Sequence, residues 1–196
     1  MVSLGVVARA PIRHAKYAEY LELEERSETK HEFLRGEIFA MAGGTPDHAA
    51  LQMAVGAALV RALEGKPCRV FSSDLRVRVE ATDFACYPDV TVVCGKLETS
   101  GVDKNAAVNP KLIVEVLSES TEDYDRGSKA AHYRRIASLD EYVFVSQREP
   151  YIEVWRRNER RRWELAVEAR SGELAEIVSA GGATLSVDAI YANPLE

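Results

Sequence analysis

"YPDVTVVCG" (87–95) and "PKLIVEVLSES" (110–120) are two short apolar runs, and each contains an acid where an apolar residue would be expected. Their Val, Ile and Thr residues favour β-strands, and such continuous apolar runs are typical of strands in the middle of a sheet. Asp89 stands at the beginning of the first run, and Glu115 in the middle of the second. Burying an ionised carboxylate is costly unless a positive group meets it. The two acids therefore need a chemical explanation.

The length and composition of the chain indicate a single globular domain, residues 1–196. A chain of 196 residues can bury a substantial core, and 46% hydrophobic with 29% charged residues is the balance of a globular protein. The net charge of −6 argues against a protein that coats nucleic acid nonspecifically, because that function needs a broad positive field. It does not exclude an enzyme that meets nucleic acid at one local face.

Cysteine usage and the absence of targeting signals predict a cytoplasmic protein. Cys68, Cys86 and Cys94 are odd in number and form no CxxC pair, so we expect reduced, mostly buried thiols. No apolar stretch approaches the ~20 residues that span a bilayer. The first residues, "MVSLGVVARAPIRHA", lack the basic start and long apolar run of a signal peptide. We therefore expect no membrane partner.

Turn and capping residues divide the chain into short elements of both types. Gly36 supplies a turn, while Thr45 and Pro46 are the N-cap and first residue of a helix that stops at Gly65. The predicted elements are a helix at 16–26, strands on either side of 35–36, a helix at 46–64, a strand at 75–79, the two apolar strands, a helix at 125–137, a strand at 141–146, a hairpin turning near 158–159 and short strands in the tail. This order predicts an α/β to α+β fold, a mixed β-sheet flanked by helices with peripheral hairpins.

If the two apolar strands are neighbours, Asp89 and Glu115 converge at one edge of the sheet. Two like charges held close together raise one pKa and leave the site half protonated. A hard divalent cation, Mg²⁺ or Mn²⁺, removes this conflict, because it prefers oxygen ligands and is usually held by one or two carboxylates. Lys129, near the beginning of the following helix, could reach back to the same edge. This arrangement predicts phosphodiester hydrolysis, with Asp89 and Glu115 as metal ligands.

"YPDV" followed by "VEVLSEST", "YDRGSKAAHYRRI" and "LDEYVFV" resembles the Uma-type endonuclease family. This family is a branch of the PD-(D/E)XK nuclease superfamily with the restriction-endonuclease-like fold, and the resemblance covers residues 15–190. It implies a metal-dependent enzyme acting on DNA, with Asp89 at the PD position and Glu115 as the strand acid. The superfamily lysine position is Leu117 here, and the resemblance implies that Lys129 takes over its role.

Three further expectations rest on this resemblance or on position. Glu32 falls where related enzymes place an acid from an N-terminal element near the metal, so it is a candidate catalytic residue. His48, in the first turn of the long helix, is a weaker candidate for the same site. Nucleases of this fold often form homodimers, which makes a homodimer an expectation for this chain.

Each candidate also has an ordinary structural explanation. Asp89 could cap a turn, Lys129 could be a solvated helix residue, and His48 could pack at a helix end. Glu115 could pair with Arg76 or Arg134 in a structural salt bridge. The acids outside the constellation have such an explanation as the first choice: a turn for Asp74, and a solvated loop with a helix cap for Glu119, Glu122, Asp123 and Asp125. The "RRNERRR" turn (156–162) could contact phosphates or could simply be a charged hairpin tip.

Three functions remain open from the sequence. The first is the metal-dependent DNA nuclease. The second is a catalytically silent interaction domain that keeps the fold, which would be expected to lose one of the three charged groups. The third is a metal-dependent phosphoesterase for small substrates, which would need a closed pocket where a nuclease needs an open cleft.

Overall fold

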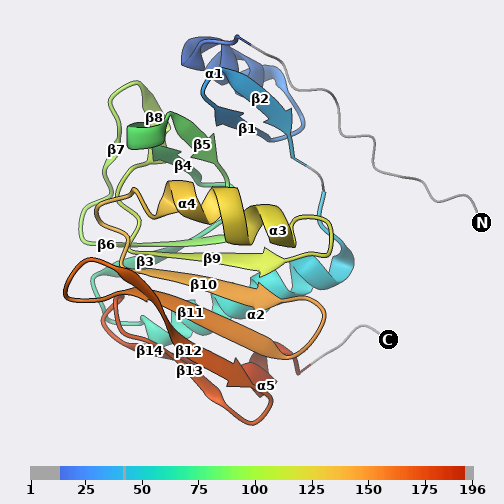
Figure 1. Cartoon of the computed structure of the whole chain (residues 1–196), viewed down its shortest axis with the longest axis vertical. Helices are drawn as coiled ribbons and strands as arrows, with labels where there is room; N and C mark the ends of the chain where they lie inside the picture. The colour runs from blue at the N-terminus through green and yellow to red at the C-terminus, as the bar shows by residue number, and fades with distance from the viewer. Residues whose placement is uncertain (1–13, 42, 193–196) are drawn as a thin grey trace, which may run out of the picture.

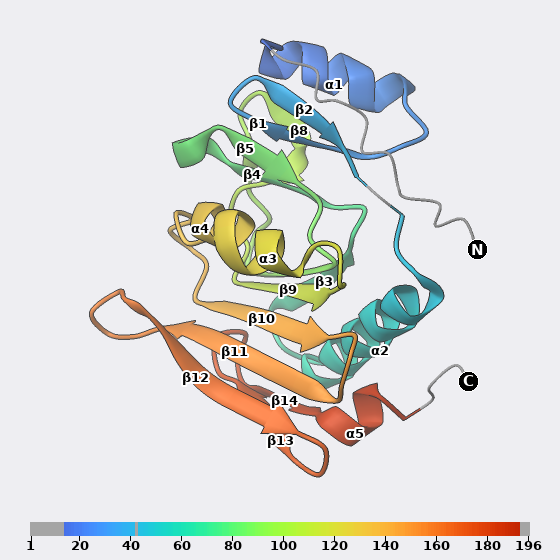
Figure 2. The same cartoon turned by 45° about the vertical axis from the view of Figure 1, so that its right-hand side comes forward.

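The computed structural model describes residues 14–41 and 43–192, and its strands form two large, six-stranded sheets and a small two-stranded sheet, with helices around them. Figures 1 and 2 show the two sheets one above the other, with a short helical segment between them. The predicted α+β class is confirmed, but the strands are divided between two sheets rather than collected in one. The expectation about a signal peptide concerns residues that mostly lie outside the described ranges.

The central sheet contains both apolar strands. Its order is β12-β11-β10-β9-β6-β3, in which only the pair β9–β10 is parallel. Its strands are β3 (Cys68–Ser72), β6 (Val90–Cys94), β9 (Leu112–Leu117), β10 (Glu141–Ser146), β11 (Tyr151–Arg157) and β12 (Trp163–Arg170). The strands that follow Asp89 and contain Glu115 are therefore adjacent, as the predicted convergence requires.

The N-terminal sheet has the order β2-β1-β5-β4-β8-β7. Its strands are β1 (His31–Leu34), β2 (Glu37–Ala40), β4 (Arg76–Val79), β5 (Phe84–Cys86), β7 (Thr99–Ser100) and β8 (Asp103–Ala107), with a 3₁₀ turn at Glu80–Thr82. The turn between β1 and β2 is at Arg35–Gly36, and Gly36 has φ +89°, a conformation that favours glycine. The predicted N-terminal hairpin is thus confirmed.

A helical segment fills the space between the two sheets. It consists of α3 (Glu122–Tyr124), a π-helical turn (Asp125–Lys129) and α4 (Ala130–Tyr133). Tyr133 and Ile136 pack with Val77 and Phe84 of the N-terminal sheet and with Ile113 and Phe144 of the central sheet in one core cluster. Burial of this apolar surface joins the two sheets, and the predicted helix at 125–137 is shorter and less regular than expected.

The outer faces are covered by the remaining helices and a hairpin. The helix α1 (Tyr17–Arg26) packs through Tyr20 on Phe33 and Ile38 of the N-terminal sheet. The other face of the central sheet carries α2 (Pro46–Ala62), the hairpin of β13 (Leu174–Ile177) and β14 (Ala183–Ser186), and α5 (Val187–Ile190). Within the described ranges, no helix combines the length and the apolar character needed to cross a membrane.

The cysteine prediction is wrong for two of the three residues. Cys68 and Cys94 lie directly opposite one another on the antiparallel strands β3 and β6, and they form a disulfide. Only Cys86 is a buried free thiol, as expected for all three. The pairing of two strands decides which cysteines meet, and the spacing of cysteines along the chain does not reveal that pairing.

Candidate functional site

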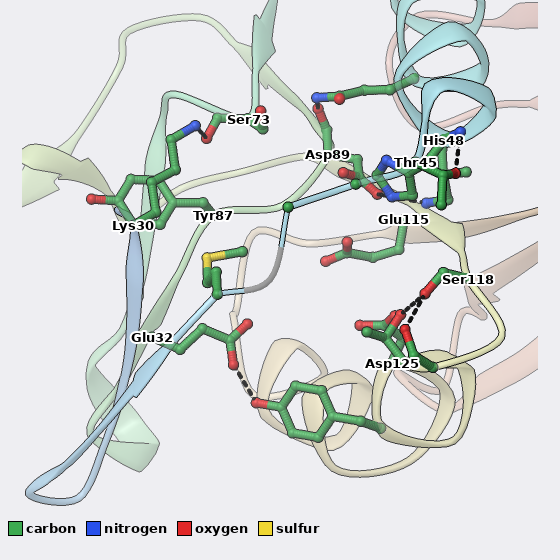
Figure 3. A pocket seen from close by; sticks show the side chains of 18 of the residues that line it. Lys30, Glu32, Thr45, His48, Ser73, Tyr87, Asp89, Glu115, Ser118 and Asp125 are labelled. Atoms are coloured by element: carbon green, nitrogen blue, oxygen red, sulfur yellow. Dashed lines mark hydrogen bonds and ion pairs between the residues drawn. The ribbon is translucent and has the colours of Figure 1, made fainter. Parts of the chain in front are cut away.

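A cleft of about 790 Å³ opens beside the C-terminal end of β9, and both sheets contribute to its walls. Figure 3 shows Glu32, Asp89, Glu115 and Asp125 directed into it from different sides. These acids come from β1, from the residue before β6, from β9 and from the π-helical turn, so distant parts of the chain form one site. His48 and Lys129 line the same cleft.

Asp89 is held in place by three contacts. Its Oδ2 atom accepts a hydrogen bond from the backbone N–H of Val116 at 2.7 Å and lies 3.2 Å from Nε2 of His48. The side-chain amide of Gln52 donates to the main-chain oxygen of Asp89 at 2.8 Å. Since Val90 pairs with Val114, extending the register by one residue places Asp89 opposite Glu115. Asp89 is therefore fixed beside the second acid.

His48 lies at the cleft as well as at the helix end. It is in the first turn of α2, where its backbone N–H donates to the N-cap Thr45. Its hydrogen bond with Asp89 raises the pKa of the imidazole, against the lowering effect of burial. A Cβ atom on Gly44 would lie 2.9 Å from Nδ1 of this ring, so the glycine leaves space for the observed ring position.

Glu115 is buried at 3% exposure and is neutralised from the following helical segment. Its Oε1 atom lies 2.9 Å from Nζ of Lys129 and accepts a hydrogen bond from the Tyr133 hydroxyl at 3.2 Å. Burial raises the pKa of this carboxyl well above its usual range, Asp89 adds to the rise, and Lys129 opposes it.

The alternative pairing of Glu115 with Arg76 or Arg134 does not hold. Those arginines contact Asp103 and the Trp155 ring instead.

Lys129 is buried, which excludes the solvated surface residue that the sequence left open. Its side chain is 6% exposed, and Nζ also lies 3.1 Å from Asp125 and 3.8 Å from Glu32. Burial alone would lower the pKa of the ammonium, but Glu115, Glu32 and Asp125 outweigh burial and raise that pKa. Leu117, at the superfamily lysine position, packs in the core between the sheets. The structure thus has an apolar contact at that position and the ammonium on the π-helical turn.

Glu32 reaches the cleft from β1 of the N-terminal sheet and is buried. Its Oε2 atom accepts a hydrogen bond from the Tyr124 hydroxyl at 2.7 Å (Figure 3 draws this contact), while Oε1 faces Lys129. Glu32 therefore belongs to the same group of charges as Glu115.

Sequence reasoning missed Asp125, which it assigned to a solvated loop. Asp125 is buried against Lys129, whereas Glu119 and Asp123 of the same loop are exposed and Glu122 pairs with Arg126. The spacing of Asp125 and Lys129 by four residues was the available signal. The π-helical turn, a feature often found at functional sites, brings both side chains to the interior.

The exposed Asp74 pairs with Lys30 at a turn, as the sequence suggested.

Three of the five arginines around the hairpin turn, Arg156, Arg157 and Arg161, make structural contacts. Arg156 pairs with the buried Glu141, while Arg157 donates to the carbonyl oxygens of Arg134, Ile136 and Ala137 after α4. Figures 1 and 2 show this β11–β12 turn at the opposite end of the molecule from the N-terminus of α2. The tip therefore does not form a rim of the cleft.

The donor atoms of Asp89 and Glu115 suit a hard divalent cation. In the described part of the chain, their side-chain contacts use one oxygen of each, Oδ2 and Oε1, which leaves carboxylate oxygens directed at the cleft. Among the described residues, no group of three His, Cys, Asp or Glu side chains is preformed for a metal. Mg²⁺ needs no such group, because it commonly uses one or two carboxylates with water and substrate phosphate.

Comparison with known proteins identifies relatives over almost the whole chain. The sequence model of the Uma2 family, described as "Putative restriction endonuclease", matches residues 17–188. The uncharacterized protein slr1290 of Synechocystis sp. is 34% identical over 182 residues, covering 93% of this chain and 94% of that protein. The uncharacterized protein sll1609 of the same organism is 34% identical over 172 residues, covering 88% and 95%.

A solved structure shares the fold. The crystal structure of "a putative nuclease belonging to DUF820" from Anabaena variabilis superimposes with a TM-score of 0.70, covering 89% of this chain and 96% of that one. The sequences are 16% identical, so this likeness supports the fold and not the activity.

Proposed function

Because the chain belongs to the Uma2 family, whose description is "Putative restriction endonuclease", we propose that it is a metal-dependent nuclease that hydrolyses DNA phosphodiester bonds. One observation carries the proposal: Asp89, Glu115, Glu32 and Lys129, from four separate segments, line a single cleft. Burying charged groups costs free energy of folding. Groups with perturbed pKa values of this kind cluster at active sites.

Asp89 and Glu115 are the proposed ligands of Mg²⁺ or Mn²⁺. When bound, the cation would polarise the phosphodiester and make water a better nucleophile at neutral pH. His48 and the Val116 N–H hold Oδ2 of Asp89, so the orientation of this carboxylate is set before a ligand arrives. Preorganisation of this kind reduces the cost of binding.

Lys129 is the proposed electrostatic group. Its ammonium, 2.9 Å from Glu115, would stabilise the negative charge that builds up on the scissile phosphate. Glu32 and Asp125 hold the ammonium from two further directions, which limits its movement. We therefore propose that Glu32 is a positioning residue that acts through its contact with Lys129.

The two alternative functions are less well supported. A silent interaction domain would be expected to lose one of the charged groups, and here Asp89, Glu115 and Lys129 are all present and in one cleft. A phosphoesterase for small substrates would need a closed pocket, whereas this cleft is partly open to solvent and has walls from two sheets.

We extend the proposal to location and assembly. We propose a cytoplasmic location because the proposed substrate is DNA. Disulfides are rare in that compartment, so the Cys68–Cys94 bridge is unusual for this location. A homodimer would rest on the outer face of α2, where the apolar side chains of Met53 and Val60 are 72% and 58% exposed. Contiguous exposed apolar patches are typical of contact surfaces.

The test is cleavage of supercoiled plasmid, linear duplex and single-stranded DNA with Mg²⁺, with Mn²⁺ and with a chelator. We expect cleavage of at least one substrate with metal, and a loss of about 100-fold or more in Glu115→Gln, because a buried ligand is removed without a change of shape. The matched control is Glu119→Gln, on the exposed loop four residues later, which should cleave normally. Cleavage that persists with chelator, or in Glu115→Gln, would contradict the proposal.

A further inference from the structure

Tyr124 is an exposed aromatic residue that is fixed at the wall of the cleft. It is 37% exposed, and its hydroxyl donates to Glu32 at 2.7 Å. A tyrosine held at its hydroxyl end keeps a defined ring orientation, and the ring lines the cleft. An ordered and accessible aromatic face beside the charged groups is therefore available to a ligand.

Two further apolar side chains continue this surface on the N-terminal sheet. Phe39 of β2 lies directly opposite Glu32 in the antiparallel register, so both side chains point to the same face. Met41 follows two residues later, and its N–H donates to the Lys30 carbonyl at 2.9 Å, which continues the β1–β2 pairing. Both residues are half-buried and line the cleft. We call Phe39, Met41 and Tyr124 the apolar margin.

The charges of the cleft limit what can bind beside this margin. Its carboxylates are Glu28, Glu32, Asp89, Glu115 and Asp125, against two ammonium groups, Lys30 and Lys129. Both lysines already have carboxylate partners, Asp74 and Glu115. Binding of duplex DNA depends largely on cations that contact successive phosphates. Within the described residues, this cleft offers no such row, so affinity must come from other contacts.

Base stacking is the contact that the margin can supply. Single-stranded nucleic acid binds to aromatic side chains through its base faces, and every base has such a face. In a duplex, those faces are covered by neighbouring bases.

We propose that the apolar margin binds a nucleobase next to the scissile phosphate, and that the substrate class is single-stranded DNA or an unpaired DNA end. This inference rests on the proposed nuclease function and names its substrate. Tyr124 contacts the base, Phe39 and Met41 flank it, and the phosphate then lies at Glu115 and Lys129.

The experiment measures binding of a short single strand that carries one 2-aminopurine, with Ca²⁺ in place of Mg²⁺ to slow cleavage. Stacking on an aromatic ring quenches the fluorescence of this base. We expect quenching at one position in the strand, and at least tenfold weaker binding of a blunt duplex of the same sequence. Tyr124→Ala should bind the strand about 10-fold more weakly and lose the quenching. Tyr124→Phe keeps the ring but loses the hydroxyl contact with Glu32, so it should quench the base and bind the strand more tightly than Tyr124→Ala.

A matched control is Tyr151, whose hydroxyl also donates to a glutamate, Glu168, but on β11 away from the cleft. Tyr151→Ala should bind like the wild type. An abasic site at the quenched position should cause the same loss as Tyr124→Ala, and combining the two should add nothing, as expected for two partners of one contact. The melting temperature of each variant shows whether it is folded.

Three results would overturn the inference: unchanged binding by Tyr124→Ala, an equal loss in Tyr151→Ala, or equal binding of the blunt duplex. The two proposals remain distinguishable. Specific binding and quenching without any cleavage in Mg²⁺ or Mn²⁺ would support the base site and reject the nuclease. Cleavage of duplex DNA at wild-type rates by Tyr124→Ala would do the reverse.

Discussion

The ammonium of Lys129 lies within 4 Å of carboxylate oxygens of Glu115, Asp125 and Glu32 and is almost completely removed from solvent. The Lys129 ammonium therefore has two roles, and a single substitution affects both. It compensates three buried acids, and it is the nearest positive charge to the proposed phosphate position. Breaking a buried ion pair by removing one partner costs about 3–5 kcal/mol, because the remaining charge is uncompensated.

We therefore expect Lys129→Ala to be folded but less stable, and to cleave DNA about 10²–10³ times more slowly, the usual effect of a lost electrostatic donor. Lys129→Arg should restore stability better than activity, because a planar guanidinium does not replace a compact ammonium. Cleavage rates and urea unfolding curves measure the two effects separately. Lys111→Ala, which breaks the ion pair with Asp140, is the matched control. Near-normal cleavage by Lys129→Ala would remove this residue from the mechanism.

The helix α4 is held between the sheets partly by His132, whose ring stacks on Phe84 of β5 at 4.7 Å between centroids. Burial lowers the pKa of this imidazole, and the charge of Arg35 lowers it further. The neutral ring is therefore favoured in the folded protein, and the free energy of unfolding depends on pH through this group.

The sign of this link follows from the lowered pKa. Between the folded-state pKa and the ordinary value of about 6.5, the unfolded chain binds more protons than the folded one. The stability that comes from the neutral His132 ring is fully present above about pH 6.5. It is lost as the pH falls from there towards the folded-state pKa. His132→Phe keeps the stacked ring without the titration. Between pH 7.5 and pH 5, we expect its urea midpoint to fall less than that of the wild type. His14→Phe, at the exposed N-terminal end of the described chain, should follow the wild type. Parallel pH profiles for wild type and His132→Phe would contradict this assignment.

At the scale of the whole molecule, the proposed active site is formed between two sheets that share one core. The cluster around Tyr133 and Phe144 contains residues of both sheets, so we expect the described part of the chain to unfold as one cooperative domain. A ligand that binds only the folded protein then stabilises the entire chain.

Millimolar Mn²⁺ should raise the melting temperature of the wild type, by an amount corresponding to about 2.7 kcal/mol at a concentration 100 times the dissociation constant. Asp89→Asn should lose this shift, because it removes a proposed ligand with little change in shape. Asp74→Asn, which changes an exposed acid outside the cleft, should keep it. Differential scanning calorimetry measures all three proteins. An equal shift in Asp89→Asn would place the ion elsewhere.

The sequence alone predicted several of the elements and the central pair of acids. The apolar runs around Asp89 and Glu115 specify buried strands because β-branched residues and burial act locally, and Thr45 with Pro46 specifies the beginning of α2 for the same reason. The position of Lys129 near the start of the following helix, and the resemblance with leucine at position 117, also indicated Lys129 as the site lysine.

Only the tertiary structure decided the environment of these residues. The division into two sheets, the Cys68–Cys94 bridge and the burial of Asp125 depend on which segments pack together. The contact of Tyr124 with Glu32 joins residues 92 positions apart. Local preferences carry no information about such pairs, because their energy comes from burial and charge compensation that exist only after the chain has folded.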